Sequence, residues 1–256
     1  MALADNLIAY WTLDEASGNA IDAHGSNDLT ETSGTIDAAS GKVGGARDFE
    51  AGDTEWFEIA DNTDLSTGDI DFTFACWVRA ETLASFPCIA QKGWSGLASA
   101  DREWVLYYNT TSSRFVMEKG AGTAAVSVTA SNFGAASTAT GYFVVIYHDS
   151  VNDIIGISVN AGTPNTTSTS TGVNNGNRAF VLGASTVGQS LYWDGVIDEA
   201  GFWKRVLTSD ERTELYNIGN GRDYAYIIGG GGGGITSPLT RSKLLTSPLI
   251  GGRLVF

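Results

Sequence analysis

The chain has 256 residues, 32 of them glycine, with a formal net charge of −14 at pH 7 and a pI near 4.4. A surface this acidic repels phosphate groups, which argues against nucleic acid as a partner and against anionic membrane surfaces. No stretch reaches the roughly 18 consecutive apolar residues that a membrane-spanning helix needs, so we expect no membrane insertion. The turn-rich composition favours short strands over helices.

Short β-branched and aromatic runs, separated by clusters of Gly, Asn, Asp and Ser, follow one another between residues 6 and 228 and predict strands. In chain order, the clearest runs are residues 7–13, 56–59, 72–78, 104–108, 142–147, 154–159 and 179–182. Two packed sheets are the natural way to bury so many aromatic runs, which predicts an all-β, two-sheet antiparallel sandwich. Residues 163–177, nearly all Thr, Ser, Asn and Gly, predict a surface loop or irregular edge.

One short helix is predicted near the end of this region. Thr208 and Glu211 have the spacing of a capping box, in which each side chain satisfies the backbone donor of the other. We expect Leu215 and Ile218 to pack against the sandwich, and Gly219 to end the helix.

Six consecutive glycines, Gly229–Gly234, then interrupt the pattern and predict a flexible linker. The sequence thus divides into a domain at residues 1–228, a linker at 229–234 and an extended basic tail at 235–256. The tail carries a charge of +3, and the rest of the chain carries −17.

The tail repeats the unit Thr-Ser-Pro-Leu, ending at Leu239 and again at Leu249, among basic residues. An extended segment of this kind is suited to dock on neighbouring subunits of a homo- or hetero-oligomeric assembly through backbone hydrogen bonds and apolar anchors. The predicted docking residues are Leu239, Arg241, Lys243, Leu249 and Arg253. The alternative is that the tail folds back on its own acidic domain.

Cys76 and Cys88 both lie in apolar runs, where a free cysteine behaves as a small hydrophobe. We expect packed free thiols, with a bridge between neighbouring strands as the alternative. The first residues lack the basic region of a signal peptide, and an acidic residue, Asp5, follows within a few positions. No signal peptide is therefore predicted. An exposed protein of this kind would be released as a phage particle is, by lysis, or would have lost its signal.

Several blocks in order resemble the laminin-G-like jelly-roll domains of the concanavalin-A-like superfamily. These blocks are Leu7–Asn19, Ala20–Asp28, Gly45–Asp53, Asp71–Val78 and Asp194–Glu211. The chain departs from the family pattern at His24, which takes a usual Ser place, and at Gly141-Tyr142, which replaces a Trp-His pair. The resemblance implies an antiparallel jelly roll. It implies no single function, because this fold carries lectins, adhesion modules, hydrolases and structural domains.

No catalytic pattern stands out. Glycan hydrolases on this fold carry paired carboxylates on one strand, and their Glu-x-Asp-x-Glu or Glu-x-Asp-x-x-Glu pattern is absent. His24 and His148 are the only histidines, and neither cysteine lies in an activating motif. The glycine run has no following lysine and cannot serve as a phosphate-binding loop. We therefore predict that the chain is not an enzyme.

The resemblance also implies a structural Ca²⁺ that ties the first loop to the last strand. Carried over by position, the predicted metal ligands are Asp22 and Asp198. The alternative is that Asp22 shapes a turn and Asp198 accepts backbone hydrogen bonds.

Carbohydrate recognition uses aromatic faces beside a few polar groups. Trp94, flanked by Gly93 and Ser95, is the predicted ligand-binding residue because a loop tryptophan has no obvious core to fill. Tyr107 is a second candidate, since one of two adjacent strand tyrosines must face outward. The alternative for Trp94 is a packing or subunit-contact role.

The leading functional hypothesis is a non-catalytic structural and display protein of a larger assembly, a phage virion or tail component with a glycan-binding jelly roll. Its place would be the virion or an extracellular surface. The alternative is a stand-alone, calcium-dependent carbohydrate-binding module.

Overall fold

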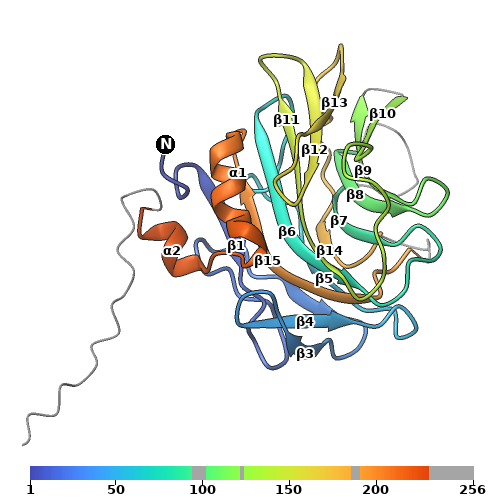
Figure 1. Ribbon diagram of the computed structural model, residues 1–256. Coiled ribbons are helices and arrows are strands. Elements are labelled where there is room, and N and C mark those ends of the chain that lie inside the picture. The colour runs from blue at the N-terminus through green and yellow to red at the C-terminus, as the bar shows by residue number, and fades with distance from the viewer. Residues whose placement is uncertain (94–101, 122–123, 186–190, 231–256) are drawn as a thin grey trace, which may run out of the picture.

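The computed structural model describes residues 1–93, 102–121, 124–185 and 191–230 (Figure 1), which form two antiparallel sheets. The large sheet has eight strands: β13 (Asn165–Ser168), β12 (Ile154–Val159), β11 (Gly141–Asp149), β6 (Phe72–Ala80), β15 (Gly195–Trp203), β4 (Gly45–Phe49) and β3 (Asp37–Ser40) in this order, with β1 (Leu7–Trp11) also paired to β15. The small sheet has seven: β10 (Ala124–Thr129), β9 (Arg114–Ala121), β8 (Trp104–Asn109), β7 (Cys88–Lys92), β14 (Phe180–Leu182), β5 (Trp56–Ile59) and β2 (Thr30–Thr32). The predicted two-sheet jelly-roll sandwich is confirmed.

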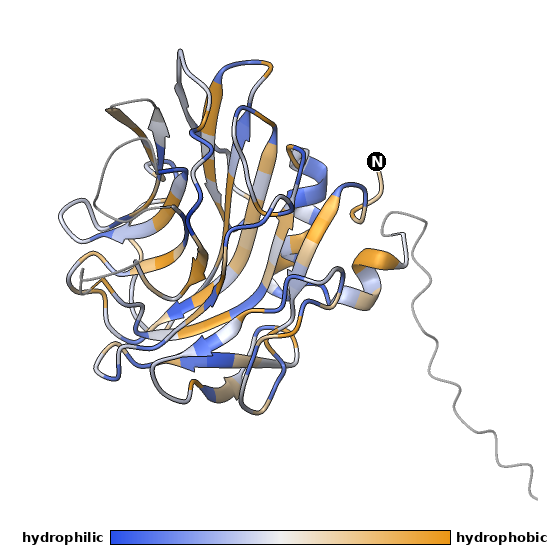
Figure 2. Cartoon of the chain, turned by 180° about the vertical axis from the view of Figure 1, so that it is seen from behind, coloured by the Kyte–Doolittle hydropathy of each residue, from blue (hydrophilic) through white to orange (hydrophobic). Residues whose placement is uncertain are grey.

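The main hydrophobic core lies between the two sheets. Strand side chains alternate between faces, so Phe72 and Phe74 of β6 enter this core while Trp77 points to the other side. The Trp11 ring of β1 stacks on Phe180 of β14 across the core, with ring centroids 5.1 Å apart. Figure 2 shows apolar and polar residues alternating along several strands.

A second hydrophobic cluster covers the outer face of the large sheet. Helix α1 (Ser209–Tyr216) packs Leu215 against Trp77 and Phe143, and Leu207 joins the same cluster. The capping box is confirmed: Thr208 Oγ1 accepts from Glu211 N at 3.3 Å, and Glu211 Oε2 accepts from Thr208 N at 2.8 Å.

Three details differ from the sequence analysis. Ile218, expected to pack, is 90% exposed, because its backbone takes the left-handed conformation at φ 54° in the 3₁₀ turn η2 (Asn217–Gly219) and the chain turns away from the sheet. A second helix, α2 (Tyr224–Ile228), follows. Helix α1 ends at Tyr216 with its C-cap at Asn217, two residues before the predicted stop at Gly219. Within segment 163–177, predicted as a surface loop or irregular edge, residues Asn165–Ser168 pair with β12 as an edge strand, in agreement with the second alternative.

Both cysteines are free and buried, as expected. Burial raises the pKa of each thiol well above its ordinary value. The predicted domain boundary at residue 228 coincides with the end of α2 and stays a prediction. In the described part of the chain, no helix has the length and hydropathy needed to cross a membrane.

A candidate binding face on the seven-stranded sheet

The outward side of the small sheet carries the strongest candidate site. In β7, Ala90 faces the core and Gln91 faces outward; in β8, Leu106 and Tyr108 face the core and Tyr107 faces outward. Strand register then sets one row of side chains across the sheet, from Glu118 of β9 through Val105, Gln91 and Val181 to Glu58 of β5. We call this row, together with Tyr107 and Trp56, the outer face.

Gln91 lies at the centre of the outer face, and its side chain is fully buried. Among the residues that the structure describes, neither Nε2 nor Oε1 of Gln91 has a hydrogen-bond partner. A buried polar group without a partner costs about 1 to 3 kcal/mol. Among the described residues, Trp104 Nε1, His148 Nε2 and Trp193 Nε1 are buried without a partner as well, so the unpaired amide does not by itself mark a ligand site.

Tyr107 and Glu118 flank Gln91 on one side. Both side chains are half-buried, and the Tyr107 hydroxyl and the Glu118 carboxylate influence each other's pKa. Burial raises the pKa of Glu118, and Arg102 and the Tyr107 hydroxyl lower it only in part. Burial also raises the pKa of Tyr107, as does the Glu118 charge. The structure thus places the predicted ligand residue Tyr107 beside two polar groups that can bind sugar hydroxyls.

An aromatic pair flanks Gln91 on the other side. Trp56 of β5 and Tyr192 are both partly exposed, with ring centroids 6.1 Å apart and planes tilted by 31°. Trp56 Nε1 donates to Glu58 Oε2 at 3.1 Å, which fixes the indole along the face. Sequence reasoning missed this pair, although the alternation of Trp56, Phe57 and Glu58 in a short strand already places Trp56 and Glu58 on one side.

The outer face does not have the geometry of a glycoside hydrolase. Neighbouring strands lie about 4.8 Å apart, so Glu118 and Glu58, four strand spacings apart, are separated by about 19 Å. Hydrolytic carboxyl pairs stand about 5 to 9.5 Å apart. These two carboxylates are too distant to act on one glycosidic bond, and the row instead suits an extended ligand held by polar and aromatic contacts.

Hydrogen-bond donors of the protein occupy the acceptor positions of the carboxylate of Asp22, the first predicted metal ligand. Its oxygens accept from Tyr10 N at 2.9 Å, His24 N at 3.0 Å, and Asn27 N and Nδ2 at 2.9 and 3.2 Å. Burial raises the pKa of Asp22, but these backbone hydrogen bonds outweigh it and the pKa lies below its ordinary value. A carboxylate with about four acceptor positions has little left for a cation, so Asp22 fits the turn-shaping role.

Asp198, the second predicted ligand, is buried in β15. Its Oδ2 accepts from Lys42 N at 2.5 Å and Val43 N at 3.0 Å, while Oδ1 has no hydrogen-bond partner in the described part of the chain. Burial raises the pKa of Asp198 to about 7. Across the described residues, no contact joins Asp198 to Asp22, and no group of three or more Asp, Glu, His or Cys side chains could hold a metal ion. The calcium site stays a prediction.

The remaining predicted site residues lie outside the described residues. These are Trp94, which follows β7, and the tail residues Leu239, Arg241, Lys243, Leu249 and Arg253. Their predicted roles in ligand binding and subunit docking therefore stay predictions.

The two sheets and their strand order define a jelly-roll sandwich. A family model described as "Concanavalin A-like lectin/glucanases superfamily" matches residues 51–211, and the chain belongs to this family. The resemblance seen in the sequence is thereby confirmed. A comparison with curated proteins gave no match.

Solved structures share the fold at low identity. The binding domain of Paraclostridial Mosquitocidal Protein 1 has a TM-score of 0.68 at 13% identity, over 84% of this chain and 53% of that chain. Domain 4 of AbnA, an extracellular arabinanase from Geobacillus stearothermophilus, was solved with arabinotriose. It has a TM-score of 0.63 at 17% identity, over 81% of this chain and 97% of that chain. The binding domain of Botulinum Neurotoxin DC, solved with SialylT, has a TM-score of 0.61 at 12% identity, over 85% of this chain and 52% of that chain. This chain therefore spans about half the length of the two toxin binding domains.

Proposed function

We propose that this chain is a non-catalytic carbohydrate-binding module that holds an oligosaccharide along the outer face. The observation that carries the proposal is the pair of partly exposed rings, Trp56 and Tyr192, beside the partly exposed Glu58 carboxylate. A sugar ring can lie against these rings through its C–H face while its hydroxyls donate to the Glu58 carboxylate. Trp56 and Tyr107 supply partly exposed rings for the apolar faces of the sugar.

The comparisons support a binding role of this class. The similar structures are two toxin binding domains and one domain of an extracellular arabinanase, and two of the three were solved with arabinotriose and SialylT. These ligands belong to those proteins. For this chain, we propose the general class of extended glycans.

The test is binding of the full chain to an immobilised glycan panel, followed by calorimetry on the best ligand. Trp56→Leu keeps an apolar residue and removes the flat ring. We expect it to weaken binding about five- to tenfold, the effect of one lost aromatic contact. Unchanged affinity would refute the outer face as the site. No reducing sugar should appear with any polysaccharide.

Tyr107→Phe provides a second variant with a matched control. It removes the hydroxyl next to Glu118 and should weaken the same interaction. Tyr226→Phe makes the same chemical change on α2, where the hydroxyl donates to Glu214 at 2.6 Å, and should leave affinity unchanged. Equal effects of both variants would contradict the assignment.

A second proposal concerns the context of the module. We infer that it is displayed by a larger assembly, a phage virion or tail at an extracellular surface, with Leu239, Arg241, Lys243, Leu249 and Arg253 docked on neighbouring subunits. The supporting observation is the change from a −17 domain to a +3 tail across six glycines. The alternative is a calcium-dependent module acting alone. Native mass measurement of the full chain and of residues 1–228 separates the two, because only docking predicts that the truncated chain loses its oligomer and keeps its glycan affinity.

A further inference from the structure

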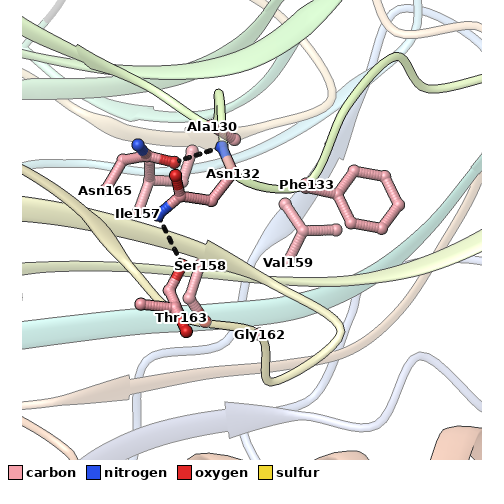
Figure 3. Close-up of a pocket in the computed structure, with 9 residues that line it drawn as sticks. All are labelled: Ala130, Asn132, Phe133, Ile157, Ser158, Val159, Gly162, Thr163 and Asn165. Atoms are coloured by element: carbon pink, nitrogen blue, oxygen red, sulfur yellow. Dashed lines mark hydrogen bonds between the residues drawn. The ribbon is translucent and has the colours of Figure 1, made fainter.

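A pocket separate from the outer face lies at the seam where edge strands of the two sheets meet. It has a volume of about 490 Å³, and strands β12 and β13 of the large sheet contact β10 of the small sheet here. Its lining comes from the segment that follows β10, from the end of β12 and from the β12–β13 turn (Figure 3). The lining residues are Ala130, Asn132, Phe133, Ile157, Ser158, Val159, Gly162, Thr163 and Asn165.

The wall of this seam pocket is held in place by hydrogen bonds across it. Asn132 N donates to Asn165 Oδ1 at 2.8 Å, and Asn132 Nδ2 donates to the carbonyls of Thr163 and Pro164 at 3.3 Å each. These bonds tie the small-sheet segment to the β12–β13 turn. The pocket is therefore formed before any ligand arrives, which lowers the entropy lost on binding.

The seam pocket is amphipathic. In Figure 3, Phe133 and Val159 lie on one side, and Asn132, Asn165 and Thr163 lie on the other. The Phe133 ring is partly exposed and is fixed edge-to-face against Tyr142, with centroids 5.4 Å apart and planes at 82°. One aromatic wall opposite a polar wall matches a sugar ring, which has apolar C–H faces and a hydroxyl rim.

Four polar groups of the pocket lining have hydrogen-bonding capacity to spare. Among the described residues, Asn132 Oδ1, Asn165 Nδ2, Thr163 Oγ1 and the buried Ser158 Oγ take part in no hydrogen bond. They offer an acceptor, a donor and two hydroxyls that can do both, the mixture that sugar hydroxyls require.

The lining also excludes charged ligands. All nine lining residues are uncharged, although the chain carries 29 Asp and Glu and 15 Lys and Arg. A carboxylate or sulfate in this pocket would lose hydration without meeting an opposite charge, which is unfavourable.

We propose that the seam pocket is a second saccharide site, selective for neutral sugars, so that one module binds glycan at two separate places. The proposal rests on the pocket itself and goes beyond the site on the outer face. Two sites on one rigid domain would raise the apparent affinity for a glycan surface without any new contact at either site.

The test is chemical-shift mapping on the full, isotope-labelled chain with four neutral trisaccharides: arabinotriose, xylotriose, cellotriose and maltotriose. We expect at least one, at millimolar concentration, to shift the side-chain amides of Asn132 and Asn165. Sialyllactose, a charged probe, should leave them in place. If none of the four moves these amides, or if sialyllactose moves them equally, the proposal is wrong.

Two variants locate the interaction. Phe133→Leu keeps an apolar residue and removes the flat ring, and should weaken binding about five- to tenfold, as expected for one aromatic contact; Phe86→Leu, at an exposed phenylalanine outside the pocket, should have no effect. Thr163→Val removes an exposed hydroxyl that makes no hydrogen bond with any described residue, so the fold should be unaffected while the affinity falls. Because Trp56→Leu leaves the seam pocket intact, the Asn132 and Asn165 shifts must persist in that variant. Their loss there would assign them to the outer face and overturn the second site.

Discussion

The Tyr10 hydroxyl of β1 donates a hydrogen bond to the Glu199 carboxylate of β15, deep inside the protein. Glu199 sits in a bulge where the pairing of β15 with β6 shifts between Asp198 and Gly201, and its backbone has φ 49°. Because of this bulge, two successive acidic residues, Asp198 and Glu199, both occupy buried positions. The hydrogen bond between Tyr10 and Glu199 therefore links the first and last strands of the sandwich, and the pKa of the Glu199 carboxyl group in it is raised.

This pair predicts a stability that falls with rising pH. Burial raises the pKa of Glu199 to about 9, with the neighbouring Asp198 adding to the effect, and burial raises the pKa of Asp198 to about 7. The folded protein therefore holds protons that the unfolded chain releases near its ordinary carboxyl pKa of about 4. Their stabilisation is complete below that value and is lost as the pH rises toward 9. Melting temperature against pH measures it.

The variant that isolates the effect is Glu199→Gln, which carries the neutral state at every pH. It should remove the decline between about pH 7 and pH 9, while the decline that Asp198 causes below about pH 7 remains. Glu81→Gln, at an exposed site, should retain the wild-type slope. A wild-type slope in Glu199→Gln would contradict the assignment.

A second prediction concerns Glu211, which combines the helix cap with a buried ion pair. Its Oε2 accepts from Arg205 Nη1 at 2.7 Å and from Thr208 N at 2.8 Å. Burial raises the pKa of Glu211, but the Arg205 hydrogen bond and the cap lower it overall, so its stabilisation is present at neutral pH and is lost as the pH falls. Glu211→Gln should destabilise the chain by about 2 kcal/mol at pH 7, measured by urea unfolding. Asp210→Asn in the same turn should change stability by less than about 0.5 kcal/mol.

The local elements were predictable because short patterns determine them. The capping box needs only Thr208 and Glu211 at the correct spacing, and the aromatic strands need only period-two burial, so both were found from sequence. The outward orientation of Tyr107 is predictable for the same reason, because Leu106 and Tyr108 face the core, whereas its role in ligand binding stays a prediction.

The candidate site could be predicted only in part, because it depends on register between distant strands. Gln91 reads as an ordinary strand residue until Val105 and Val181 are known to flank it and its amide is seen to lack a partner. The seam pocket likewise requires segments about 30 residues apart in sequence, around Asn132 and Asn165, to meet. No periodicity within either segment carries that information.

A third prediction addresses a buried ion pair at the edge of the core. Lys92 Nζ donates to Glu103 Oε1 at 2.9 Å, and both side chains are fully buried. Thr67 also donates to Glu103 through its backbone and its hydroxyl, at 3.0 and 2.7 Å. Lys92→Met leaves a buried carboxylate without its counter-charge and should cost about 3 to 5 kcal/mol. Adding Glu103→Gln should recover part of the loss, and a double variant less stable than Lys92→Met alone would argue against the pairing.

The last prediction separates the two candidate calcium ligands. Because the Asp22 carboxylate is filled by four protein donors, Asp22→Asn should destabilise the chain by about 2 kcal/mol to the same extent in calcium and in chelator. Asp198 Oδ1 has no hydrogen-bond partner in the part of the chain that the structure describes, so any rise in melting temperature with calcium should disappear in Asp198→Asn and persist in Asp22→Asn. Thermal melts of the three proteins in calcium and in chelator decide the matter. A calcium effect abolished by Asp22→Asn would show that this carboxylate exchanges its backbone partners for the ion.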